Sequence, residues 1–86
     1  MQPMSHLRWR ASKTANARTR PGTFNWFILG YFRGKRGAKP VDLVTKILVE
    51  WVDGGGKVTW QKPRAYVQQR IYELGRRGIL TIENLP

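Results

Sequence analysis

Side chains with amide, phenol and guanidinium groups recur at helical spacing along residues 64–78. Within this segment Val67, Ile71 and Leu74 are spaced so that a helix places all three in one apolar stripe. The opposite side and its flank carry Ala65, Gln68, Gln69 and Tyr72. Glutamine can form two hydrogen bonds with adenine. The pattern therefore predicts a helix that contacts base edges in a major groove through these four residues. A solvated amphipathic helix would show the same spacing.

Cations flank this segment at both ends. Arg76 and Arg77 lie in the predicted last turn, where the helix dipole favours positive charge, and Gly78 is a natural helix stop. Lys62 and Arg64 stand at the predicted start. Arginine and lysine side chains pair with phosphate oxygens and set the register of a protein on a duplex. We therefore expect these four cations to contact phosphates.

The chain of 86 residues carries sixteen Lys and Arg against five Asp and Glu, a net charge of +11. Nine of the basic residues and none of the acids fall within residues 1–41. This charge favours a nucleic acid or an anionic membrane as partner, although a basic protein that simply repels its neighbours has the same composition. The longest apolar run, residues 24–32, is far shorter than the about 20 residues that cross a bilayer. We expect a nucleic acid, and neither a membrane nor a small molecule, as the partner.

Residues 1–22 combine Arg and Lys with Ser, Thr, Ala and Asn, and their apolar content is low and scattered. This composition predicts a flexible basic arm outside a folded domain of residues 23–86. The cations of the arm are expected to bind phosphates, and they are Arg8, Arg10, Lys13, Arg18 and Arg20. Trp9 either stacks on a base or packs back onto the domain. An organelle transit peptide, also rich in Arg and Ser and poor in acids, is the alternative for this stretch.

The residue types that catalysis needs are sparse. The chain has one histidine, His6, no cysteine and five scattered acids. These residues form no acid–base pair and no cluster with metal-ligand spacing. We therefore expect a binding protein rather than an enzyme, without a cofactor or a metal.

Two further helices are expected between the arm and residues 64–78. The first covers residues 24–33 with an aromatic core stripe, and the second covers residues 41–52. The glycine-rich loop between them is basic, and its expected phosphate contacts are Lys35, Arg36 and Lys39. Residues 54–56 are three glycines that end the second helix in a turn.

Two short segments have strand character. Residues 57–60 alternate polar and apolar side chains, as a half-buried strand or an extended turn would. Residues 79–82 form an apolar run directly after Gly78. We expect this run to pair with residues 58–60 or to begin a wing.

The order of helix, basic turn, helix, glycine turn, longer helix, glycine and strand resembles the winged helix-turn-helix class. The motif Val67-x3-Ile71-x2-Leu74-x3-Gly78-Ile79-Leu80 is similar to the end of the recognition helix in small bacterial, archaeal and phage repressors. Residues 39–48 look like the preceding helix of that motif. The resemblance covers about residues 24–82 and implies a mostly α fold with a small β component, a three-helix domain with a minimal wing.

Two features depart from the class. Residues 53–63 make a long link between the second and third helices, and the wing is short. In an alternative register, residues 41–52 are the first helix and residues 58–60 the first strand. Both registers keep residues 64–78 as the helix that contacts the bases.

The leading functional hypothesis is sequence-specific binding to double-stranded DNA by a transcriptional regulator of phage, viral or plasmid type. Such a protein acts in the cytoplasm or nucleoid of a prokaryotic cell. One alternative is an RNA-binding protein that stacks bases on exposed aromatic rings, with Trp9, Trp26, Tyr31 and Trp60 as candidates. Another is a small viral protein that inhibits a host nucleoprotein through an apolar patch of Trp26, Leu29 and Phe32. A homodimer through the same patch is the expected oligomer, if one forms.

Overall fold

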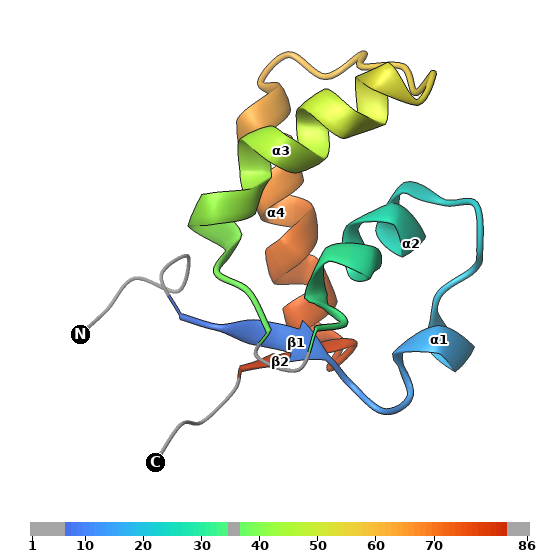
Figure 1. Cartoon of the computed structure of the whole chain (residues 1–86), viewed down its shortest axis with the longest axis vertical. Coiled ribbons are helices and arrows are strands. Elements are labelled where there is room, and N and C mark those ends of the chain that lie inside the picture. The colour runs from blue at the N-terminus through green and yellow to red at the C-terminus, as the bar shows by residue number, and fades with distance from the viewer. Residues whose placement is uncertain (1–6, 35–36, 83–86) are drawn as a thin grey trace.

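The computed structural model describes residues 7–34 and 37–82, and this part of the chain is mostly helical with a small antiparallel sheet (Figure 1). The elements in chain order are β1 (Trp9–Ala11), α1 (Ala15–Arg18), α2 (Phe24–Leu29), the 3₁₀ helix η2 (Gly30–Phe32), α3 (Pro40–Asp53), α4 (Pro63–Arg76) and β2 (Leu80–Ile82). Helix α4 is central: it lies behind α3 and α2 in Figure 1, and its end meets the sheet.

The predicted third helix is present as α4, and its apolar stripe forms the middle of the core. Val67, Ile71 and Leu74 are almost completely buried. Pro63 occupies the first turn, where its missing N–H removes no helical hydrogen bond. Gly78 has a φ of +75°, which lets the Ile79 N–H bond to the Leu74 carbonyl at 3.0 Å and close the last turn. This cap turns the chain directly into β2.

The predicted second helix is present as α3 and packs along α4. Pro40 is at its first position, and Val44 and Ile47 face the core. The glycine turn after it adopts the same type of cap, because Gly55 has a φ of +94° and the Gly56 N–H bonds to the Trp51 carbonyl at 2.8 Å.

The predicted first helix is divided into α2 and the 3₁₀ turn η2. Thr23 caps it, since its hydroxyl accepts a hydrogen bond from the Trp26 N–H at 3.2 Å. Ile28, Leu29 and Phe32 are fully buried. The patch predicted from Trp26, Leu29 and Phe32 was therefore wrong, because two of its three members lie in the core.

The sheet joins the two ends of the described chain. Trp9 pairs with Ile82, and Ala11 pairs with Leu80. The expectation that residues 79–82 pair with residues 58–60 was wrong, because residues 57–60 have no strand structure and β1 takes their place. Trp9 also exchanges two backbone hydrogen bonds of 2.8 Å with Ala38.

Trp9 shows that part of the predicted arm belongs to the domain. Its side chain is 3% exposed and lies in the core with Leu80 and Leu74, and Ala15 of α1 is buried as well. Residues 9–15 thus contribute a strand and two core side chains. Of the two fates considered for Trp9, packing onto the domain is the one observed.

Candidate nucleic-acid interface

The outer face of α4 carries the side chains that the sequence singled out. Ala65, Gln69 and Arg76 are exposed, whereas Gln68 and Tyr72 are half-buried at one flank. The buried stripe of α4 points in the opposite direction, so contacts with α3, α2 and β2 hold the helix from behind. A ligand can therefore approach Gln69 and Arg76 without any rearrangement of the core.

Gln68 and Tyr72 are joined to each other. The Gln68 amide nitrogen donates a hydrogen bond of 2.9 Å to the Tyr72 hydroxyl oxygen, across one turn of the helix. Because the oxygen accepts this bond, the phenolic proton remains available to an outside acceptor. The pair orients the hydroxyl of Tyr72. Of the two neighbouring glutamines, Gln69 is the exposed residue and Gln68 the half-buried one.

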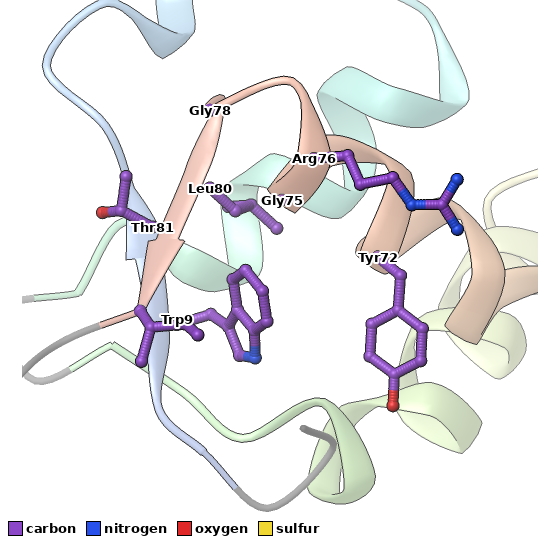
Figure 2. Close-up of a pocket in the computed structure, with 8 residues that line it drawn as sticks. Trp9, Tyr72, Gly75, Arg76, Gly78, Leu80 and Thr81 are labelled. Carbon is purple, nitrogen blue, oxygen red and sulfur yellow. The ribbon is translucent and has the colours of Figure 1, made fainter. Parts of the chain in front are cut away.

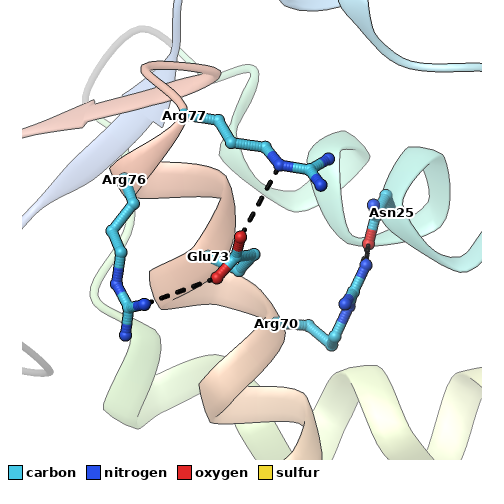
Figure 3. Close-up of polar contacts among 5 residues, drawn as sticks. All are labelled: Asn25, Arg70, Glu73, Arg76 and Arg77. Carbon is cyan, nitrogen blue, oxygen red and sulfur yellow. Dashed lines mark hydrogen bonds and ion pairs between the residues drawn. The ribbon is translucent and has the colours of Figure 1, made fainter.

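Glu73 lies between two arginines at the end of α4 (Figure 3). Its carboxylate is 3.6 Å from Arg76 Nη1 and 3.6 Å from Arg77 Nε. Both arginine side chains are more than half exposed, so these ion pairs contribute little to stability. The guanidinium groups can exchange the carboxylate for a phosphate at small cost.

Arg70 has a structural role that the sequence did not reveal. Its Nη2 and Nε donate hydrogen bonds of 3.0 and 3.3 Å to Asn25 Oδ1, which ties α4 to α2 (Figure 3). Arg70 is half-buried, so its stem covers part of the core. Its position at the edge of the apolar stripe was the available signal for this role.

Arg18, one of the cations of the predicted arm, lies beside the end of α4. Lys13 and Arg18 are exposed, and a Cβ added at Gly78 would be 3.5 Å from Arg18 Nη1. Because β1 pairs with β2, residues about sixty positions apart in the sequence meet here. We call the basic end the cations of β1, of the turn and helix α1 that follow it, and of the end of α4, which are Arg10, Lys13, Arg18, Arg76 and Arg77.

The other predicted phosphate contacts are dispersed. Lys62 and Arg64 are exposed at the start of α4, and Arg20 is exposed after α1. Arg8 and Lys39 are half-buried. Lys35 and Arg36 lie outside the described residues.

Two hollows border the basic end. One, of about 420 Å³, is lined by Arg10, Ala11, Ser12, Lys13 and Thr81. The other, of about 400 Å³, has an apolar floor of Trp9, Gly75 and Leu80 (Figure 2). One side of the second hollow is formed by Tyr72 and Arg76, which lie on the outer face of α4. The hollow therefore connects this face of α4 with the sheet.

The rings proposed for base stacking are engaged within the protein. Trp9 is buried, and Trp60 stacks on Tyr66 with ring centres 4.0 Å apart. The Tyr31 hydroxyl donates a 2.6 Å hydrogen bond to Glu50, and burial together with this carboxylate raises the pKa of Tyr31 to about 12. Trp26 is half-buried under the Arg33 guanidinium, which lies 4.5 Å from its ring centre.

The aromatic cluster instead connects three helices. Phe24 of α2 contacts Trp51 of α3, Tyr66 of α4 and Trp60 of the link before α4, with ring centres 4.8 to 6.2 Å apart. Trp60 belongs to the link of residues 54–62, so its contacts with Phe24 and Tyr66 hold the link against α2 and α4. The rings form a second apolar cluster beside the main core rather than an open stacking surface.

Comparison of the chain with protein-family models, with curated proteins and with solved structures gave no match. Within residues 7–34 and 37–82, no helix has both the length and the apolar content needed to cross a bilayer. The same residues bring together no group of three His, Cys, Asp or Glu side chains that could hold a metal ion.

Proposed function

We propose that this protein binds double-stranded DNA in a sequence-specific manner, with α4 in the major groove. The observation that supports this most directly is the outer face of α4, where Gln69 and Arg76 are exposed on a helix whose opposite side is fixed in the core. A major groove about 12 Å wide admits one α-helix with its side chains. The resemblance of residues 67–80 to a winged helix-turn-helix recognition helix supports the same reading.

Each side chain on the outer face has a distinct role in this proposal. Gln69 forms two hydrogen bonds with an adenine, and the Tyr72 hydroxyl donates its free proton to a base or phosphate acceptor. Ala65 makes room for a base edge and contacts a thymine methyl group. Gln68 orients Tyr72 through the 2.9 Å hydrogen bond.

The cations supply affinity and orientation. The basic end binds phosphates at one end of α4, and Lys62 and Arg64 bind phosphates at the other. Such contacts fix the helix along the groove but carry no sequence information. The protein would then act as a small transcriptional regulator of the kind that phages, viruses and plasmids encode.

A basic surface attracts any polyanion, so the test must separate sequence preference from charge. We would select binding sites from random duplex DNA at two salt concentrations. The expected result is one motif enriched at both concentrations, with total binding lower at the higher salt. Recovery of sites that share no motif would mean that the protein binds DNA through charge alone, and it would refute sequence-specific binding.

RNA is tested in the same assay by competition. Of the aromatic rings considered for single-strand binding, Trp9 is buried, and Tyr31 and Trp60 pack against other rings of the protein. We therefore expect structured and single-stranded RNA to displace the selected duplex poorly. Stronger competition by RNA than by unselected duplex DNA would favour an RNA-binding function instead.

A further inference from the structure

Strand β2 forms an open edge of the sheet. Within the part of the chain that the structure describes, β1 is the only strand that pairs with β2. Trp9 lies opposite Ile82 but exchanges its two backbone hydrogen bonds with Ala38, on the other side of β1. In an antiparallel ladder, the residue opposite such a position also turns its backbone groups outward, and the direction alternates along the strand. The N–H and C=O groups of Ile82 and Leu80 therefore point away from β1, where an added strand can pair with them.

The two faces of the sheet beside this edge differ in chemistry. On the face toward α4, the hollow with Trp9 and Leu80 in its floor extends to the exposed side chain of Ile82 (Figure 2). Successive side chains of a strand point to opposite faces, so Arg10 lies on the face away from α4. There, Arg10 and Lys13 line the other hollow. One face at the edge is thus apolar and the other is basic.

We propose that an extended peptide segment of a partner protein, with alternating apolar and acidic side chains, adds to β2 as a third strand. An added strand has the same two-residue period as β2, so its side chains alternate between the two faces. Its apolar side chains enter the hollow beside Trp9, and its carboxylates lie near Arg10 and Lys13. Main-chain hydrogen bonds to Leu80 and Ile82 give affinity, and the two hollows give specificity. The inference does not depend on DNA binding.

Charge favours an acidic partner over a second copy of this chain. Arg76 lines the hollow on the α4 side, and Arg10 and Lys13 line the hollow on the other side. No carboxylate is among the described residues that line either hollow. Two β2 edges side by side would bring the cations of both copies together, and like charges across a strand pair are destabilising. An acidic segment meets opposite charge at the same place.

A pair of peptides separates strand addition from plain attraction between charges. The probe is a fluorescein-labelled peptide that alternates valine and glutamate, and the control has the same residues in two blocks, first the valines and then the glutamates. Both peptides have the same charge, but only the alternating order places all carboxylates on one face of a strand. Fluorescence anisotropy with the full chain should give a dissociation constant about tenfold or more lower for the alternating peptide. Equal affinities would reflect charge alone and would overturn the proposal.

A proline at position 82 tests the main-chain contact. The Ile82 N–H points to the open edge, so Ile82→Pro removes a donor to the added strand and none to β1. Ile82→Val keeps this donor and is the matched control. We expect Ile82→Pro to raise the dissociation constant of the alternating peptide about tenfold, and Ile82→Val to change it less than about twofold. Circular dichroism confirms that both variants are folded. Unchanged binding by folded Ile82→Pro would contradict strand addition.

Sedimentation of the full chain without peptide tests the other possible occupant of the edge. Because the cations beside β2 repel those of another copy, we expect no dimer that depends on this edge. A wild-type dimer that becomes a monomer on Ile82→Pro substitution would assign the edge to a second copy and would overturn the proposed peptide site.

Discussion

Gly75 lies in the last turn of α4 at the point of closest approach to the Trp9 indole. A Cβ added at Gly75 would be 2.4 and 2.8 Å from two ring carbons of Trp9. Helix propensity alone favours alanine over glycine at such a position by about 1 kcal/mol. Because the ring is buried and cannot move aside, the overlap outweighs that gain. Gly75 is therefore required for the packing of β1 on α4.

We expect Gly75→Ala to lower the free energy of unfolding by about 1–3 kcal/mol, the usual cost of overpacking a core. Gly30→Ala is the matched control, because it also lies in a helical turn but has no atom within 4 Å of the added Cβ. Chemical denaturation measures both variants. Equal stability of the two variants would mean that Trp9 does not pack against α4.

Gln69 tests the assignment of base contacts. In the proposed complex, Gln69→Ala removes a bidentate contact with adenine that is worth about 1–3 kcal/mol of discrimination. We expect the preference for the selected sequence over random duplex to fall by that amount, while affinity for random duplex is unchanged. Gln61→Ala removes another exposed glutamine, which lies outside α4, and should leave both affinities unchanged. Fluorescence anisotropy with the two duplexes measures the difference, and identical effects of the two substitutions would contradict the role of Gln69.

Tyr31 makes stability depend on pH in the alkaline range. Its pKa rises from 10.0 to about 12 in the folded protein through burial and the hydrogen bond to Glu50. The folded state thus favours the neutral phenol. This contribution to stability is complete below pH 10.0, and it is lost as the pH rises toward 12.

We expect Tyr31→Phe to reduce the loss of stability between pH 10.0 and about 12. Urea unfolding on both sides of this range measures the effect. Phenolate absorbance provides a second measurement, since the substitution should remove the phenol that titrates near pH 12. An unchanged alkaline profile would show that Tyr31 titrates normally.

At the scale of elements, periodicity predicted the long helices and failed for the short strand. Helices α3 and α4 each span fourteen residues, which is long enough for apolar stripes such as Val67, Ile71 and Leu74 to stand out. Strand β1 has three residues, with Trp9 between two arginines. Its partner β2 begins nearly seventy residues later, so no local pattern indicated the pairing.

The candidate site was likewise predictable where it depends on a long helix, and not where it depends on the strand pairing. The outer face of α4 follows from helical geometry, so Ala65, Gln69 and Arg76 are exposed as expected. The position of Arg18 beside the end of α4 depends on the pairing of β1 with β2 and was not predictable from composition. For the same reason Gly75 was not recognised as the residue that admits the Trp9 ring.

Strand β1 also changes the expected effect of removing the N-terminal segment. A mobile arm could be deleted without harm to the fold. Trp9, however, is a core side chain, and replacing a buried tryptophan by alanine costs about 3–5 kcal/mol. We expect Trp9→Ala to unfold the protein partly or fully near 37 °C, as thermal circular dichroism will show. As a control, Ala17→Gly changes an exposed residue of α1 and should have a much smaller effect. Retention of the wild-type melting temperature in Trp9→Ala would place the ring outside the core.

At the scale of the whole molecule, charge is divided between two regions. The basic end gathers cations from β1, α1 and α4, whereas α3 carries more carboxylates than ammonium groups. The location of the cations, and not only their number, should therefore determine how the protein binds a polyanion.

Two double variants with the same net charge test this division. Lys13→Gln with Arg18→Gln removes two cations of the basic end, and Lys46→Gln with Lys57→Gln removes two exposed cations elsewhere. Each pair lowers the net charge from +11 to +9. Every phosphate contact contributes about 0.9 to the slope of log affinity against log salt, so the first pair should reduce the slope by about 1.8. The second pair should reduce it far less, because those side chains do not touch the duplex. Anisotropy titrations with random duplex at several salt concentrations measure both slopes. If the two variants lose the same slope, the protein attracts DNA through its net charge alone, and the basic end has no special role.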